Sequence, residues 1–263
     1  MRGKHVVVSF SGGKDSTAML LRMLELGEHI DEVLCCDTYK EFPAMYRHID
    51  KVKAVVEEAG IKFTHLRNKK SFDYYMFDHQ RTRGKHIDKV GYGWATPRNR
   101  WCTSTMKQWI MQRHLKEVAK AKDVVQCVGI AADEEYRLER KANARDGIRF
   151  PLVEWTWTEK DCLEYCYSKG FDWEGLYEIF DRVSCWCCPL KSLEELRKLQ
   201  THFPELWNEL KEMDNRSWNQ FRPDFSVYDL EIRFKLEKEF EQSGKSIRSK
   251  EFYEELRKRL VKK

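Results

Sequence analysis

The sequence predicts an α/β fold in which a twisted parallel sheet carries helices on both faces, followed by a helical C-terminal extension. Residues 5–10 are rich in β-branched residues and end before a glycine pair, as a short buried strand does. Helix-like and strand-like segments then alternate as far as residue 169, an order typical of parallel sheets with right-handed crossovers. Beyond Asp172 the chain is charged and its pattern is helical.

Each element follows from the local pattern of apolar residues. Strands are expected at 5–10, 32–37, 61–66 and 123–130, with a brief extended piece at 150–153. Helices are expected at 15–26, 46–59, 102–121 and 159–169. Residues 68–100 break into aromatic, basic and glycine-containing stretches, and so long a loop in a compact domain is usually functional or disordered. We therefore expect an α/β domain over residues 1–170 and a helical region over residues 171–263.

The composition is that of a globular protein, since 41% of the 263 residues are hydrophobic and 35% are charged. The net charge of +5 permits a polyanionic partner, although a solvated surface explains it equally well. The first ten residues do not resemble a signal peptide, and no apolar run approaches the roughly 20 residues of a membrane span. We expect a cytoplasmic protein without a membrane partner, whose nine cysteines stay reduced. The sequence leaves the oligomeric state open.

The six residues after the first strand indicate phosphate binding. Ser11-Gly12-Gly13-Lys14-Asp15-Ser16 opens a helix, so that backbone N–H groups and the positive end of the helix dipole can meet one anion. Lys14 adds a full positive charge, and the serines add hydroxyl donors. The spacing is not that of a Walker loop. A plain strand–turn–helix corner capped by Asp15 is the alternative, but such a corner does not need this concentration of Ser, Gly and Lys.

This loop resembles the pyrophosphate loop, or PP-loop, of the adenine nucleotide alpha-hydrolase superfamily. Members of that superfamily split ATP between its alpha and beta phosphates, or bind adenylylsulfate nucleotides. The resemblance implies a Rossmann-like fold, ATP and Mg²⁺ as cofactors, and nucleotide contacts from all of Ser11, Gly12, Gly13, Lys14, Asp15 and Ser16.

Three further segments, in the same order, resemble the phosphoadenylylsulfate (PAPS) reductase family. Asp37-Thr38-Tyr39-Lys40-Glu41-Phe42-Pro43 is similar to that family's Asp-Thr-Gly-x-x-Phe-Pro, with Tyr39 in place of the glycine. Arg100-Trp101-Cys102-Thr103 with Lys107 is similar to its Arg-x-Cys-Thr…Lys stretch. Residues 129–134 with Arg137, followed by Pro151-Leu152 and Trp155, are similar to a third stretch, although Ala131 replaces its arginine.

The PAPS reductase resemblance implies further site residues. Nucleotide contacts are expected from Asp37, Thr38, Gly129, Asp133, Glu134 and Arg137, and catalytic roles from Lys14, Asp15 and Arg100. The position of Asp133 and Glu134 supports this, because ligands bind outside the carboxyl ends of strands in parallel sheets.

The cysteines near residue 185 predict a metal centre. Cys185-Trp186-Cys187-Cys188-Pro189 contains a Cys-x-x-Cys pair, a spacing that lets Cys185 and Cys188 chelate one centre. Cys102 is a candidate third ligand, and Cys187 is a fourth ligand, a free nucleophile or neither. Zn²⁺ and a [4Fe–4S] cluster both suit such ligands. Resemblance of the cysteine pattern to DNA phosphorothioation sulfurtransferases favours the cluster. The other cysteines fall where core positions are expected.

Together these patterns predict an ATP-dependent enzyme that adenylates an acceptor and transfers sulfur with the help of the cluster. One alternative is a reductase that releases sulfite from an adenylylsulfate nucleotide. The catalytic cysteine tail of PAPS reductases is missing, however, because no cysteine follows Cys188. A further alternative is a non-catalytic nucleotide-binding component of a nucleic-acid modification or defence complex. The expected partners are ATP or adenylylsulfate, and a nucleic acid or a sulfur-donor protein.

Overall fold

Five parallel strands form the sheet in the computed structural model, which describes residues 3–139 and 146–261. They are β1 (Lys4–Phe10), β2 (Glu32–Asp37), β3 (Lys62–Arg67), β4 (Asp123–Val128) and β5 (Ile148–Arg149), in the order β3-β2-β1-β4-β5. The central strand β1 has Val6, Val7 and Val8 fully buried, because a strand covered on both faces has no polar side. The predicted parallel sheet is confirmed.

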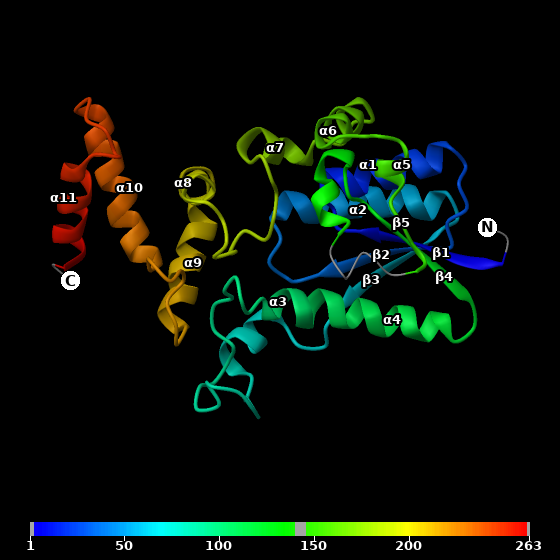
Figure 1. Ribbon diagram of the computed structural model, residues 1–263, viewed down its shortest axis with the longest axis horizontal. Helices are drawn as coiled ribbons and strands as arrows, with labels where there is room; N and C mark the ends of the chain where they lie inside the picture. The colour runs from blue at the N-terminus through cyan, green and yellow to red at the C-terminus, as the bar shows by residue number, and fades with distance from the viewer. Residues whose placement is uncertain (1–2, 140–145, 262–263) are drawn as a thin grey trace. The chain divides into compact units, whose positions relative to one another are not determined.

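Helices cover both faces of this sheet, as predicted. Figure 1 shows α1 (Lys14–Glu25) and α2 (Pro43–Glu58) on one face and α4 (Trp109–Ala119) on the other. On the face covered by α1, a further helix, α6 (Glu159–Ser168), packs against α1. The shorter helices are α3 (Trp101–Thr103), η2 (Ser104–Gln108), η3 (Ala132–Arg137), α5 (Pro151–Glu154), η4 (Trp173–Gly175) and α7 (Leu176–Ile179).

Two local predictions need correction. Residues 150–153 were expected to be extended, but α5 begins at Pro151, since proline's fixed φ suits the first position of a helix. The expected helix at 102–121 is interrupted by the π-helical turn η2. Strand β5, with two residues, was not anticipated.

The chain divides into two compact units. The first comprises Met1–Ser71 and Trp101–Cys185, and the second comprises Phe72–Arg100 and Trp186–Lys263. The expected division at residue 170 lies 15 residues before the point where the first unit ends, since 185 − 170 = 15. The expected loop at 68–100 contributes most of its length to the second unit.

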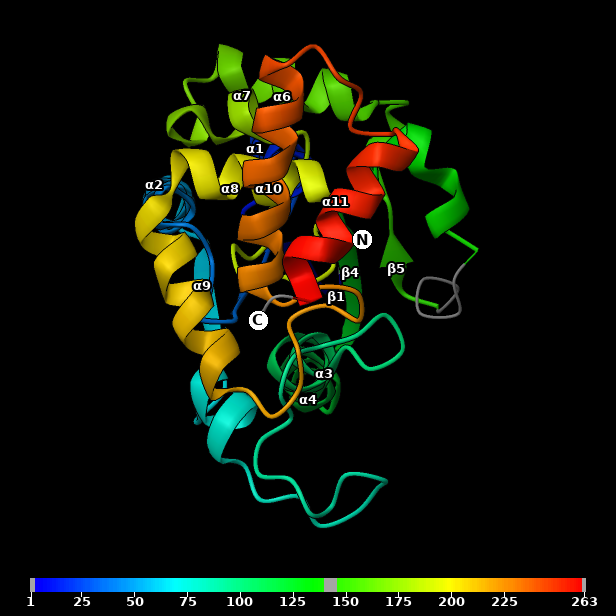
Figure 2. The same ribbon diagram turned by 90° about the vertical axis from the view of Figure 1, so that its left-hand side faces the viewer.

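The second unit is helical, as expected of the C-terminal region. It contains η1 (Tyr74–Asp78), α8 (Leu193–His202), α9 (Pro204–Arg216), α10 (Val227–Gln242) and α11 (Lys250–Val261). Figure 2 shows α10 and α11 side by side, joined through a cluster of Leu236, Phe240, Phe252 and Leu256. No helix in the described ranges is both long enough and apolar enough to cross a membrane.

Residues 72–100 are anchored to α9 and the segment after it. Trp94 Nε1 donates a hydrogen bond to Asp214 at 3.0 Å, and the backbone N–H of Trp94 donates to Asn219 Oδ1 at 2.7 Å. Arg81 lies over the ring of Trp218, 5.0 Å from its centroid. The segment is therefore built into the second unit by polar and aromatic contacts.

His48 on α2 is a buried polar residue in the core of the first unit. Its Nε2 lies 3.0 Å from Thr17 Oγ1, and its ring stacks on Trp173 with centroids 4.4 Å apart. The residue is 5% exposed. Burial, with a smaller contribution from Lys51, lowers the pKa of His48 to about 3.

Acid is therefore expected to destabilise the first unit through His48. In the unfolded chain this group titrates near 6.5, so that below this pH the unfolded state binds a proton that the folded state excludes. The stability from this group is complete above pH 6.5 and falls by about 1.4 kcal/mol per pH unit toward pH 3. Urea unfolding at pH 7 and pH 5 should show this loss in the wild type and much less of it in His48→Gln. Equal losses in the two proteins would contradict the assignment.

Candidate functional site

The sheet topology brings the ends of β1 and β4 together. From β1 the chain moves through β2 to β3, and then returns to β4 on the other side of β1. In open parallel sheets such a reversal of strand order opens a crevice at the carboxyl ends of the strands, where ligands bind. The loop after β1 contains Ser11–Ser16, and the segment after β4 contains Gly129 and Glu134. The predicted phosphate loop thus lies at the position where this fold places ligands.

The phosphate loop is held by its own serines and threonine. Ser16 Oγ accepts a hydrogen bond from the backbone N–H of Ser11 at 3.1 Å and donates to the carbonyl of Gly13 at 3.0 Å. Thr17 Oγ1 donates to the same carbonyl at 2.9 Å. Gly12 has φ +81°, and a Cβ there would lie 2.7 Å from Met45 Sδ, so this position requires glycine.

Gly129 allows the end of β4 to approach the phosphate loop. A Cβ on Gly129 would lie 2.9 Å from the Cα of Ser16 and 3.1 Å from the carbonyl carbon of Asp15. Both are backbone atoms of helix α1 and cannot move aside easily. The predicted involvement of Gly129 in the site therefore has a structural basis in this contact.

Lys14 is held between two carboxylates. Its Nζ lies 2.8 Å from Glu159 Oε2 and 3.1 Å from Asp15 Oδ1, and the residue is 8% exposed. Burial acts to lower the pKa of the Lys14 ammonium, but the charges of Asp15 and Glu159 outweigh it and raise that pKa. Lys14 is therefore a permanent positive charge at the start of α1.

Three carboxylates converge beside Lys14. The ligand oxygens of Asp15, Glu134 and Glu159 lie within 4.8 Å of one another. Burial raises the pKa of the Asp15 carboxyl, although the charge of Lys14 opposes the shift. Arg137 forms an ion pair with Glu134. Three negative and two positive charges leave this group with a net charge of −1.

Asp133, whose predicted nucleotide contact stays a prediction, is bonded to the start of α6. Its carboxylate accepts a hydrogen bond from the backbone N–H of Glu159 at 3.1 Å. This N–H belongs to the first turn of α6, where backbone donors lack partners within the helix. Asp133 therefore positions Glu159 by fixing the start of α6.

The end of β2 is organised around Asp37. This carboxylate accepts hydrogen bonds from Tyr46 Oη at 2.9 Å, from Arg67 Nε at 2.9 Å and from the backbone N–H of Tyr39 at 2.7 Å. Tyr39 has φ +65°, a conformation that favours glycine. Tyr39 is anchored in that conformation by its N–H bond to Asp37 and by a hydrogen bond of 3.0 Å from its hydroxyl to the carbonyl of Asn68.

A second polar group surrounds Cys185 in the first unit. Cys185 Sγ lies 3.3 Å from Thr38 Oγ1 and 3.3 Å from Glu41 Oε1. Lys107 Nζ lies 3.3 Å from the same oxygen of Glu41. The charge of Glu41, together with the nearby Cys185, raises the pKa of the Lys107 ammonium in spite of burial. The Cys185 thiol thus donates to the Glu41 carboxylate, which is also paired with Lys107.

The remaining site candidates are distributed over both units. Cys102 is half-buried in the first unit, while Cys187 and Cys188 follow the start of the second. Arg100 is exposed and is the last residue of Phe72–Arg100, the first of the two segments that form the second unit. The roles predicted for these four residues stay predictions.

Of the cysteines expected in the core, four are buried, whereas Cys36 at the end of β2 is half-buried. Cys35 and Cys127 lie on strands, and Cys162 and Cys166 lie on α6. Burial raises the pKa of Cys35 to about 12 and that of Cys127 to about 11. These thiols stay protonated at neutral pH and are poorly suited to bind metal.

Sequence reasoning missed Glu159 and Glu41, which contact the predicted site residues Lys14 and Cys185. Glu159 lies 145 positions from its partner Lys14. A local signal for Glu159 was available, since it follows Thr158, which caps α6. Glu41 falls inside the segment that resembles the PAPS reductase family, but it occupies one of that segment's variable positions.

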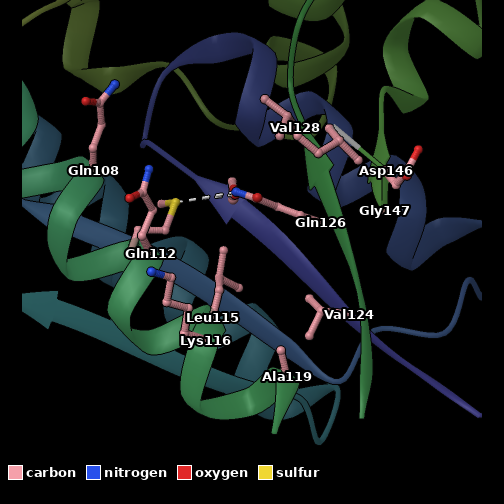
Figure 3. Close-up of a pocket in the computed structure, with 13 residues that line it drawn as sticks. Gln108, Gln112, Leu115, Lys116, Ala119, Val124, Gln126, Val128, Asp146 and Gly147 are labelled. Carbon is pink, nitrogen blue, oxygen red and sulfur yellow. Dashed lines mark hydrogen bonds between the residues drawn. The ribbon is translucent and has the colours of Figure 1, made fainter. Parts of the chain in front are cut away.

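A cavity of the first unit lies elsewhere. It has a volume of about 620 Å³ and lies between α4 and strands β1, β4 and β5 (Figure 3). Gln126 donates a hydrogen bond to Ser9 Oγ at 2.7 Å within it. None of the predicted site residues lines this cavity.

Comparisons with known proteins find similarity over most of the chain. Two uncharacterized proteins of Methanocaldococcus jannaschii are similar to this chain. One is 30% identical over 213 residues, covering 78% of this chain and 40% of the relative. The other is 27% identical over 208 residues, covering 76% of this chain and 45% of the relative. The chain thus spans less than half the length of these curated relatives.

A solved structure is also similar, though weakly. It is the U34-tRNA thiolase NcsA from Methanococcus maripaludis with its [4Fe-4S] cluster, which is 15% identical to this chain. The TM-score is 0.43, over 81% of this chain and 69% of that chain. So weak a similarity carries no argument about function. The family model for the phosphoadenosine phosphosulfate reductase domain, however, matches residues 5–191. This match covers well over half of the chain, which therefore belongs to the phosphoadenosine phosphosulfate reductase domain family.

Proposed function

We propose that this protein is an ATP-dependent enzyme that cleaves ATP between its alpha and beta phosphates, adenylates an acceptor and transfers sulfur to it. The observation that carries the proposal is the phosphate loop at the switch point of the sheet, with Lys14 and three carboxylates converging beside it. Loops of this kind bind phosphate through backbone N–H groups and the helix dipole. Lys14 would offset the charge that develops on the leaving pyrophosphate.

The carboxylates beside Lys14 support Mg²⁺ as a cofactor. A group with a net charge of −1 repels a polyphosphate unless a cation intervenes. Mg²⁺ prefers carboxylate oxygens together with substrate phosphates. Asp15, Glu134 and Glu159 are close enough to one another to supply such ligands. They would therefore hold Mg²⁺ between themselves and the nucleotide, with Lys14 free to turn from Glu159 toward the phosphates.

Removal of Mg²⁺ is expected to weaken ATP binding at least tenfold, since unscreened charge repulsion of a few kcal/mol replaces attraction. Calorimetric titration with ATP, in Mg²⁺ and then in EDTA, measures the change. In the variant Glu134→Gln, the ATP affinities measured in Mg²⁺ and in EDTA should differ less, because the variant lacks one of the charges that repel the phosphates. Equal affinity in Mg²⁺ and EDTA would contradict the metal assignment.

The cysteine centre is proposed to be a [4Fe–4S] cluster held by Cys102, Cys185 and Cys188, with Cys187 as the candidate fourth ligand. The donor set suits this group, because iron–sulfur clusters are held by cysteine thiolates. Thr38 and Glu41 lie at hydrogen-bond distance from Cys185 and would orient its sulfur. When bound, the cluster would supply an iron able to carry a sulfur atom. Zn²⁺ remains the alternative for the same ligands.

The proposed reaction has two steps. In the first, an oxygen of the acceptor attacks the alpha phosphorus of ATP, and the bond from that phosphorus to pyrophosphate breaks. In the second, a sulfur nucleophile attacks the acceptor carbon, and the carbon–oxygen bond to AMP breaks. The contribution of Ser11–Ser16 and Lys14 is to position the phosphates and stabilise the leaving pyrophosphate.

A reductase acting on an adenylylsulfate nucleotide is the second candidate, because the family model that matches this chain is that of a reductase domain. The two candidates are distinguished by supplying anaerobically prepared protein with either Mg-ATP, a sulfide source and total RNA, or adenylylsulfate with a thiol donor. Pyrophosphate release from ATP supports the proposed function. Sulfite release from adenylylsulfate, without pyrophosphate release from ATP, would overturn it.

A further inference from the structure

The geometry points to Tyr177 as a phosphate-binding residue, whose hydroxyl accepts a hydrogen bond from the phosphate loop and donates its proton to the bound phosphate. The inference deepens the proposed function and rests on it. The tyrosine lies 163 positions from the loop it contacts and belongs to α7, outside every segment from which nucleotide contacts were expected.

The contact is made to the first N–H of helix α1. The backbone N–H of Lys14 donates a hydrogen bond to Tyr177 Oη at 2.9 Å. The same hydroxyl lies 3.5 Å from the point that a Cβ on Gly13 would occupy. The oxygen therefore lies directly over the turn of the phosphate loop. An N–H at this position of a phosphate loop ordinarily faces the anion.

The Tyr177 hydroxyl keeps its proton for donation. Burial raises the pKa of Tyr177, and the nearby charges of Asp15 and Glu159 act in the same direction. The hydroxyl is therefore neutral at physiological pH. Its oxygen accepts from Lys14, so that its hydrogen is available for an acceptor beyond the loop. A phosphate oxygen in the proposed site is such an acceptor.

Tyr177 is held in place by the segment before it. Three consecutive residues have positive φ, with values of 51° at Trp173, 52° at Glu174 and 80° at Gly175. For the two non-glycine residues this conformation costs about 1 kcal/mol each, and it persists only where surrounding contacts enforce it. The segment is held by a hydrogen bond of 2.7 Å from Trp173 Nε1 to the carbonyl of Gly12 and by the ion pair of Glu174 with Arg47.

Trp173 also supports the tyrosine ring directly. The two rings meet edge to face with centroids 4.8 Å apart, and Trp173 is itself stacked with His48. The loop is thus contacted twice, at the Gly12 carbonyl by Trp173 and at the Lys14 N–H by Tyr177. A group built into the fold in this way is preorganised for a ligand and needs no ordering when the ligand binds.

Removal of the Tyr177 hydroxyl is expected to weaken the binding of ligands that contain phosphate and no others. Loss of one hydrogen bond to a charged group should weaken the binding of Mg-pyrophosphate and of Mg-ATP by about tenfold or more in Tyr177→Phe. Binding of adenosine, which has no phosphate, should not change. The matched control is Tyr165→Phe. Tyr165 lies on helix α6, and the substitution removes a hydroxyl that donates a hydrogen bond to Glu25 of α1. Calorimetric titration of the three ligands into the three proteins measures the effect, with thermal melting as the check on folding.

A second substitution tests the donor without changing its shape. Fluorotyrosine at position 177 has a more acidic hydroxyl, which donates more strongly, so Mg-pyrophosphate should bind more tightly. Unchanged or tighter binding of pyrophosphate to Tyr177→Phe would overturn the inference, and so would unchanged or weaker binding to the fluorotyrosine protein. Failure of the wild type to bind ATP and pyrophosphate would instead overturn the proposed function, and this inference with it.

Discussion

Replacement of Lys14 with alanine is expected to lower the rate of ATP-dependent pyrophosphate release by about 10²–10³-fold, the usual effect of removing one preorganised group that stabilises developing charge. Lys14 is the ammonium at the start of α1, and its contacts to Asp15 and Glu159 hold it there almost fully buried. Without it, the three nearby carboxylates would face the phosphates with less compensation. A pyrophosphate-release assay at saturating Mg-ATP measures the loss.

The control for this prediction is Lys53→Ala. Lys53 is a partly exposed lysine on α2, and its ammonium is paired with Glu57. Its removal should leave the rate unchanged. Melting curves of both variants separate a catalytic effect from a folding effect, because Lys14 also neutralises buried carboxylates. Full activity in a folded Lys14→Ala protein would contradict the role assigned to the loop.

Replacement of Cys185 with alanine is expected to abolish cluster binding and, with it, sulfur transfer. Loss of a residue that only supports a metal ligand typically costs about 10–100-fold in affinity, so loss of a ligand should cost more. The affinity for Mg-pyrophosphate should not change, because Cys185 is hydrogen-bonded to Thr38 and Glu41 and not to the phosphate loop. Iron and acid-labile sulfide, measured on anaerobically purified protein, report the loss.

Cys127→Ala is the matched control for Cys185→Ala. Cys127 is a buried cysteine of β4, and burial keeps its thiol protonated. Its replacement should leave iron and sulfide at wild-type levels. Colourless wild-type protein loaded with zinc would remove the cluster from the account while leaving the nucleotide site intact. Wild-type iron content in Cys185→Ala would contradict the ligand assignment.

Much of the fold could be predicted because its signals are local. The valines of β1 form an uninterrupted apolar run, and Ser-Gly-Gly-Lys after it is recognisable as the turn into a helix. Strand β5 could not be predicted, since two residues leave no periodic pattern. The grouping of 72–100 with the C-terminal helices depends on contacts such as that of Trp94 with Asp214, 120 positions away.

The site could be predicted where both partners of a contact lie in one segment of the sequence. The loop Ser11–Ser16 makes its internal hydrogen bonds within a few residues. The partners that complete it come from distant segments. Glu159 reaches Lys14 across 145 positions, Tyr177 reaches it across 163, and Glu41 reaches Cys185 across 144. No local pattern reports such pairs, because the sheet topology alone brings their segments together.

The most direct test of the account is competition between ATP and inorganic pyrophosphate for the wild-type protein. The central claim is that Ser11–Ser16 and Lys14 bind the pyrophosphate portion of the nucleotide. Calorimetric titration of ATP in Mg²⁺, repeated at increasing pyrophosphate, decides it. The account predicts that pyrophosphate displaces ATP competitively and that Lys14→Ala binds neither ligand well. ATP that stays bound at saturating pyrophosphate, or ATP that does not bind at all, would contradict it.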